Sequence, residues 1–160
     1  MKKLLLLSLL GLAAFGADAR IASDGGFSPE KGLDVNASFA AQREAILAAL
    51  GNGKTYAEIT PENRRRVTAS LDRIAALLGD RQQVSELPER TRLEVFNEQE
   101  LVNTLLAGAR EDSRLVCTRE KRVGSHRATT QCMTVAERRR AREESQDELR
   151  DMQRSPIMSR

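Results

Sequence analysis

The fold is decided by residues 114–133, which read RLVCTREKRVGSHRATTQCM. Two β-prone runs rich in Val and Thr, 114–118 and 128–133, lie on either side of a short polar stretch. Gly124 stands in that stretch, where it can adopt the positive φ that tight hairpin connections require. The pattern predicts an antiparallel β-hairpin at about 114–133.

Residues 1–19 indicate the compartment in which this hairpin forms. They have the form of a secretory signal peptide, because two lysines precede an apolar run at 4–15 and a small-x-small cleavage site follows at 17–19. The apolar run is shorter than the roughly 20 residues that cross a bilayer. The residue after the expected cut is Arg20, not the Cys of a lipid anchor. We therefore expect a soluble mature chain, periplasmic or secreted, without a transmembrane segment.

Cys117 and Cys132 are the only cysteines of the chain. An even number of thiols in an exported protein most simply forms disulfides. Two alternatives use the same residues. In the first, the two cysteines and His126 bind a metal ion as soft ligands, although a closed four-ligand site would lack a fourth member. In the second, the cysteines form a redox-active pair, although such pairs usually have closer spacing. We predict a disulfide, with no metal or cofactor, that contributes about 3 kcal/mol in the loop-entropy model.

A helix is predicted directly after the hairpin. Thr134 and Glu137 have the spacing of a capping box, and the helical pattern continues to about Arg154. Pro156 disfavours further helix, so residues 155–160 are expected to form a flexible tail.

This last helix is unusually polar. Opposite charges four residues apart, as in Arg139 and Glu143, support its helical shape. Its apolar stripe is thin and consists of Val135, Leu149 and Met152. The middle of the helix is therefore expected either to project into solvent or to bind a partner.

Two helices are predicted upstream, at about 38–50 and 60–78. Apolar residues recur at helical spacing in both segments. In the second segment Thr60 is the expected N-cap, Pro61 the first helical residue and Gly79 the stop. Residues 20–36, which are rich in Gly and lack apolar periodicity, are expected to form a mobile lead-in.

The segment 87–106 is predicted to break into two helices at Asn97. In a single straight helix Leu93 and Phe96 would point away from the later apolar residues. Asn97 and Glu100 have the spacing of a capping box. If this cap forms, replacing Asn97 by Ala costs about 1 kcal/mol.

The predicted fold class is mainly α. It consists of a small helical domain with one disulfide-closed β-hairpin, followed by a charged C-terminal helix. The expected organisation is a signal peptide at 1–19, a lead-in at 20–36, a single domain at 37–154 and a tail at 155–160.

Three stretches, LEVFNEQE at 93–100, LVCTRE at 115–120 and GSHRATTQC at 124–132, resemble a pattern found in small uncharacterised exported proteins of Gram-negative bacteria. The resemblance covers roughly the C-terminal half of the mature chain. It implies a secreted or periplasmic protein with a paired-cysteine hairpin followed by a charged helix. It implies no particular activity.

Composition disfavours several classes of function. The 26 basic residues are nearly balanced by 23 acidic ones, for a net charge of +3, so no nucleic-acid partner is expected. After residue 19 the aromatic side chains are Phe27, Phe39, Tyr56 and Phe96, too few for base-stacking or sugar-stacking platforms. With a single histidine and no nucleophile or phosphate-loop motif, the chain is expected not to be an enzyme. The alternative is a low-activity envelope hydrolase that uses paired carboxylates.

The hairpin tip is the strongest candidate site in the sequence. Five cationic or titratable residues gather there around Glu120: Arg119, Lys121, Arg122, His126 and Arg127. Such a patch suits an acidic protein or an anionic envelope component, while the same charges would also keep a strand edge from pairing with other chains. The sequence therefore favours a non-enzymatic binding or structural accessory protein of the bacterial envelope.

Overall fold

The computed structural model describes residues 26–154 except 82, 122 and 125. The expected signal peptide at 1–19, the expected tail at 155–160 and the candidate site residue Arg122 lie outside the described residues.

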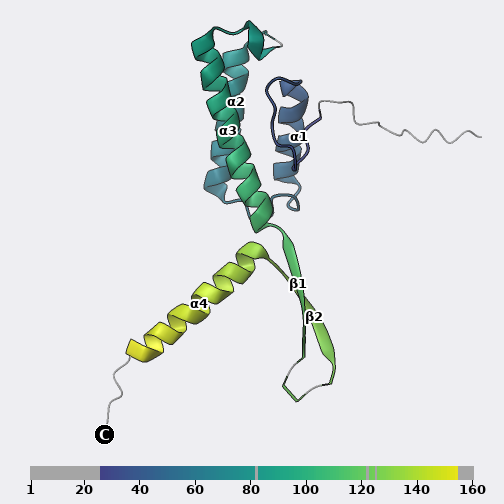
Figure 1. Ribbon diagram of the computed structural model, residues 1–160, viewed down its shortest axis with the longest axis vertical. Coiled ribbons are helices and arrows are strands. Elements are labelled where there is room, and N and C mark those ends of the chain that lie inside the picture. The colour runs from purple at the N-terminus through teal and green to yellow at the C-terminus, as the bar shows by residue number, and fades with distance from the viewer. Residues whose placement is uncertain (1–25, 82, 122, 125, 155–160) are drawn as a thin grey trace, which may run out of the picture.

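The described residues form a helical bundle from which a second, thinner part extends (Figure 1). Helices α1, α2 and α3 make up the bundle, while a hairpin and helix α4 leave it at the end of α3 and diverge from each other. The elements are α1 (Phe39–Gly51), α2 (Pro61–Leu78), a 3-10 turn (Val84–Glu86), α3 (Glu89–Asp112), β1 (Leu115–Lys121), β2 (Ala128–Thr134) and α4 (Val135–Arg154). This confirms the predicted fold class.

The hydrophobic core lies within the bundle. The cluster of buried apolar residues runs from Leu33 to Ala109 and includes none from the hairpin or α4, where Ala136 is buried outside this cluster. Helix α2 contributes Val67, Leu71 and Ile74, which are fully buried and lie on the face that packs along α3. The bundle therefore has its own core without the hairpin.

The ends of α2 are those that the sequence predicts. The Thr60 hydroxyl accepts a hydrogen bond from the Asn63 N–H at 3.1 Å, and Pro61 is the first helical residue. The helix stops at Gly79, whose φ of 56° is favourable for a residue without a Cβ.

The predicted break at Asn97 is wrong. Helix α3 runs without interruption from Glu89 to Asp112. Its buried residues Val95, Val102 and Leu106 are seven and four residues apart, which is the spacing of one helical stripe. The conflict seen in the sequence disappears because Leu93 is left 57% exposed. Asn97 is an exposed residue in the middle of the helix.

Replacing Asn97 by Ala is therefore expected to stabilise the protein by about 0.5 kcal/mol, because Ala has the higher helix propensity. Thr104→Ala, another exposed α3 position, is the reference for a pure propensity effect. Urea unfolding measures both free energies. A loss of about 1 kcal/mol for Asn97→Ala would instead indicate that a helix begins there.

The prediction of a mobile lead-in is also wrong for the residues that the structure describes. Leu33 and Val35 are buried in the core, at 2% and 1% exposure. Asn103 of α3 accepts from the Leu33 N–H at 2.7 Å and donates to the Leu33 carbonyl at 3.0 Å. Gln99 accepts from the Val35 N–H at 2.8 Å. These two amide side chains take the place of a strand partner for the lead-in.

Gly32 is required for this contact. Its φ is +78°, and a Cβ at this position would lie 2.7 Å from Asn103 Oδ1. Any other residue would be strained and would also displace the Asn103 side chain that holds Leu33.

Candidate functional site

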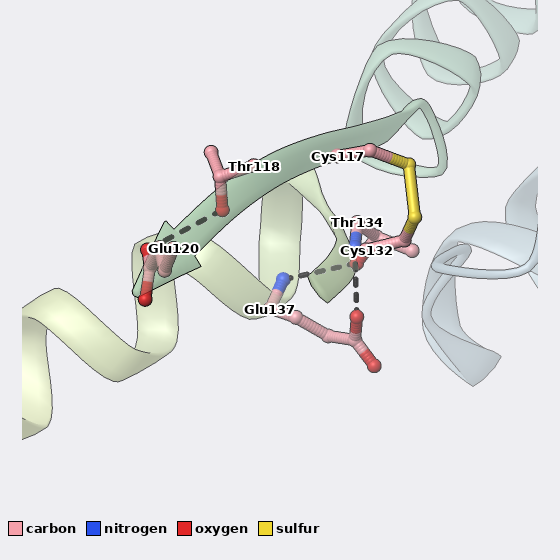
Figure 2. The surroundings of a disulfide bond; sticks show 6 residues. All are labelled: Cys117, Thr118, Glu120, Cys132, Thr134 and Glu137. Atoms are coloured by element: carbon pink, nitrogen blue, oxygen red, sulfur yellow. Dashed lines mark hydrogen bonds between the residues drawn. A yellow bond between two sulfur atoms is a disulfide. The ribbon is translucent and has the colours of Figure 1, made fainter. Parts of the chain in front are cut away.

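The hairpin is closed by the predicted disulfide. Cys117 lies directly opposite Cys132, with the Cα atoms 4.0 Å apart and the two sulfurs bonded (Figure 2). The Val135 N–H donates to the Arg114 carbonyl at 3.0 Å, so these two residues form a hydrogen-bonded pair. Since such pairs alternate with non-hydrogen-bonded ones, the cysteines occupy a non-hydrogen-bonded pair, where opposite side chains are closest.

The start of α4 is joined to β2 by the predicted capping box. The Thr134 N–H donates to Glu137 Oε2 at 2.7 Å, and the Glu137 N–H donates to Thr134 Oγ1 at 3.0 Å (Figure 2). Strand and helix meet with no connecting residue between them. The direction of α4 is therefore coupled to that of the hairpin.

Glu58 connects this corner to the bundle. Its carboxylate accepts from the Thr134 hydroxyl at 2.8 Å and from the Arg140 guanidinium at 2.9 Å, and its N–H donates to Ser113 Oγ at 2.9 Å. The Glu58 side chain is only 15% exposed. Hydrogen bonds from Arg140 and Thr134 hold the pKa of the Glu58 carboxyl below its usual range.

A second ion pair lies beside the first. The two terminal guanidinium nitrogens of Arg139 donate to the two oxygens of Asp112, at 2.9 and 3.0 Å, in a bidentate pair. This pair lowers the pKa of the Asp112 carboxyl. Arg139 thus pairs with the end of α3, whereas the sequence suggested an intrahelical pair with Glu143. We call the contacts of Glu58 and Asp112 with α4 and Thr134 the junction.

Neither carboxylate of the junction suits the role of a general acid. A general acid needs a raised pKa so that it keeps its proton at neutral pH. Arginine partners lower the pKa of both Glu58 and Asp112, so both are ionised there. What this arrangement does chemically is attach the hairpin and α4 to the bundle.

The predicted basic tip is divided between two faces of the hairpin. Arg119 and Lys121 are two residues apart on β1 and share one face, whereas Glu120 lies on the other. Glu120 accepts a long hydrogen bond from the Thr118 hydroxyl, at 3.4 Å (Figure 2). The only carboxylate of the strand therefore does not neutralise the cationic face.

Beyond the last strand pair, the described residues of the tip are exposed. His126 and Arg127 lie there with exposed side chains. Gly124 has a φ of 81°, as the sequence predicts for this connection. Val123 next to it is fully exposed. Sequence reasoning about charge alone missed this apolar residue at the centre of the basic tip.

A groove lies where the hairpin meets α4, and sequence reasoning missed it as well. It has a volume of about 570 Å³. Apolar side chains and three arginines line it: Val116, Met133, Val135 and Ala141, with Arg114, Arg138 and Arg142. Val116 and Met133 face each other across the hairpin, on the side opposite the disulfide. We call this feature the arginine groove.

No protein-family model, curated protein or solved structure matches this chain. Within residues 26–154, excluding the three undescribed positions, no three His, Cys, Asp or Glu side chains gather as metal ligands would. None of the helices in the described part is long and apolar enough to span a membrane.

Proposed function

We propose that this chain is an exported, non-enzymatic binding protein of the bacterial envelope, and that its hairpin tip contacts a phosphate-bearing anionic surface there. The observation that carries the proposal is the composition of the tip. A fully exposed Val123 lies in the connection, between Lys121 two residues before it and Arg127 four residues after it. An apolar residue surrounded by cations suits a surface in which anionic headgroups cover a hydrocarbon layer.

Export is supported by the form of residues 1–19 and by the disulfide. Disulfides form and persist in oxidising compartments such as the bacterial periplasm, and are rare in the cytosol. The Cys117–Cys132 bond is therefore compatible with the expected route.

The placement of the tip also favours a binding role. The hairpin leaves the bundle at the end of α3, so its tip can reach a surface before the bundle does (Figure 1). The disulfide keeps the two strands in register, which lowers the entropy lost when the tip binds. Charges alone could serve to prevent edge pairing, but an exposed valine does not serve that purpose.

Reversing three charges of the tip tests the proposal. The triple variant Arg119→Glu, Lys121→Glu, Arg127→Glu is expected to bind vesicles containing anionic phospholipid at least roughly a hundredfold more weakly, since each cation near such a surface contributes about 1 kcal/mol. Sedimentation with vesicles at low and physiological salt measures the affinity. The matched control reverses Arg64, Arg65 and Arg66, three exposed residues of α2.

Equal loss in the tip variant and the α2 control would mean that net charge alone drives binding, and would contradict the proposal. So would unchanged binding by the tip variant. Val123→Ser separates the apolar contribution: it is expected to weaken vesicle binding without changing its salt dependence, because it removes no charge. Capture of a soluble acidic polypeptide but not of vesicles would identify a protein partner instead and overturn the membrane-surface assignment.

A further inference from the structure

Helix α4 has no partner along most of its length within the described part of the chain. From Arg139 to Arg154 every α4 residue is exposed, and Leu149 and Met152 are among the most exposed large apolar residues, at 55% and 65%. In Figure 1 the helix runs away from the bundle. In proteins most of the stability of a helix comes from tertiary packing of its apolar face.

The charges of α4 are segregated along its length. Arg138, Arg139, Arg140 and Arg142 lie in its first half, and the stretch 143–151 that follows is mainly acidic, with Glu143, Glu144, Asp147, Glu148 and Asp151 against the single cation Arg150. Two parallel copies of this helix would bring like charges together. Two antiparallel copies would place the basic half of each beside the acidic half of the other.

One face of the helix is complementary to itself in this antiparallel arrangement. Successive residues of an α-helix turn by about 100°, so seven residues lie within about 60° of Ser145: Arg138, Ala141, Arg142, Ser145, Glu148, Leu149 and Met152. We call these residues the α4 stripe. When a two-fold axis passes beside Ser145, residues equally far from it in opposite directions lie at the same height along the interface. Ala141 is then level with Leu149 of the second copy, and Arg142 is level with Glu148 of the second copy.

The basic half of the α4 stripe already lines the arginine groove. Arg138, Ala141 and Arg142 form its α4 wall, opposite Val116 and Met133 of the hairpin. The antiparallel register directs Leu149 and Met152 of the second copy toward this apolar floor, and Glu148 of the second copy toward the arginine rim. By symmetry the second groove is filled in the same way.

Charges without an ion-pair partner and the available space support the same occupant. Among the described residues, neither Arg138 nor Arg142 is ion-paired, and Glu148 has no cationic partner. In the antiparallel register Arg154, the last described residue of α4, lies level with Ala136 of the other copy. Ala136 is the buried residue at which α4 meets the rest of the chain, so the described part of the second helix lies along the exposed part of α4 and reaches as far as the bundle.

We propose that the protein forms a two-fold symmetric homodimer through the α4 stripe, with the second half of each α4 seated in the arginine groove of the other copy. The proposal goes beyond the binding role of the tip and does not depend on it. The small side chains Ala141 and Ser145 at the centre allow the two helices to approach closely. The two hairpin tips remain outside the interface, so the dimer presents two anion-binding tips and gains avidity for a surface.

A charge-swap experiment tests the contact and its register together. Sedimentation equilibrium of the mature chain is expected to show a monomer–dimer equilibrium with a dissociation constant below about 100 µM. Arg142→Glu and Glu148→Arg are each expected to weaken the dimer by tenfold or more, because each places like charges at the same height of the interface. The double variant is expected to restore the dimer, because residues 142 and 148 of different copies then carry opposite charges at the same height again.

Leu149→Asp removes the apolar contact and is expected to weaken the dimer by about a hundredfold. The matched control is Arg150→Glu, which changes an exposed residue on the opposite side of α4. Circular dichroism at a concentration where every variant is monomeric checks that the bundle remains folded, which is expected because none of these residues contributes to the core.

Ser145→Cys provides an independent measurement. Two copies of residue 145 face each other across the proposed axis, so mild oxidation is expected to yield a covalent dimer, whereas Asp147→Cys on the far side of the helix is expected to remain monomeric. A wild-type chain that is monomeric throughout the concentration range overturns the proposal. A dimer that persists in Leu149→Asp, or a charge swap that fails to restore association, overturns it equally.

Discussion

Removal of the Cys117–Cys132 disulfide is expected to open the hairpin while the bundle stays folded. An isolated two-stranded hairpin is at best marginally stable in water, and the side chains of β1 and β2 are largely exposed. Closing a loop of 15 residues contributes about 3 kcal/mol in the loop-entropy model. The core residues between Leu33 and Ala109 include none from the hairpin, so their packing does not depend on the bond.

Hydrogen exchange in the double variant Cys117→Ser, Cys132→Ser measures this effect. The strand amides are expected to exchange roughly a hundredfold faster than in the oxidised protein, since about 3 kcal/mol of protection is lost. The amides of α2 around Leu71 serve as the internal control and are expected to keep their protection. Loss of protection in both places at once would show that hairpin and bundle form one cooperative unit. Vesicle binding by the tip is expected to weaken in parallel.

The elements that the sequence predicted correctly are those whose signals are local. Gly124 and two β-prone runs specify the hairpin, and the caps at Thr60 and Thr134 lie three residues from the N–H groups that they satisfy. A pattern read over a few residues contains all the chemistry that these features need. Predicting the disulfide required one further inference, the oxidising compartment, besides the placement of the two cysteines on facing strands.

The two failures of the sequence reasoning share a physical cause. Asn103 and Gln99 look like surface residues of α3, but they hold the backbone of residues 70 and 64 positions earlier. The lead-in is therefore ordered by a long-range contact that no local pattern displays. The capping box at Asn97 was a valid local signal, but the continuous stripe from Val95 to Leu106 outweighed it.

The candidate site likewise has parts that local sequence signals predict and parts that only the fold shows. The basic residues of the tip are adjacent in the sequence, so their charge could be recognised there, although the separation of Glu120 onto the other face requires the strand register. The junction and the arginine groove could not be predicted. Glu58 meets Thr134 and Arg140 across 76 and 82 residues, and only the fold shows which of many exposed carboxylates is the one that binds them.

Acid is expected to release the hairpin and α4 from the bundle before the bundle itself unfolds. Arg140 and Thr134 lower the pKa of Glu58 in the folded protein, and Arg139 lowers that of Asp112. A carboxyl with a depressed folded pKa contributes stability that is fully present above its unfolded pKa, about 4 for these residues. That contribution is lost as the pH falls through the lower, folded pKa. The junction is therefore expected to be intact at neutral pH and to weaken progressively below about pH 4.

Glu58→Gln removes the charge at the centre of the junction and is expected to cost about 2 kcal/mol at neutral pH, because two charge-assisted hydrogen bonds to a largely buried carboxylate are weakened. Glu44→Gln, at an exposed position of α1, is the control and is expected to change the stability little.

Exchange of the Glu137 amide, whose N–H is held by Thr134, reports on the junction as a function of pH. The wild type and the control should lose this protection on acidification, whereas Glu58→Gln should start lower and respond less to pH. An identical acid response in Glu58→Gln and the wild type would show that other groups hold α4 to the bundle. If the response instead disappears only when Asp112 is also neutralised, the two ion pairs act as one unit, and the position of the tip relative to the bundle is set by both.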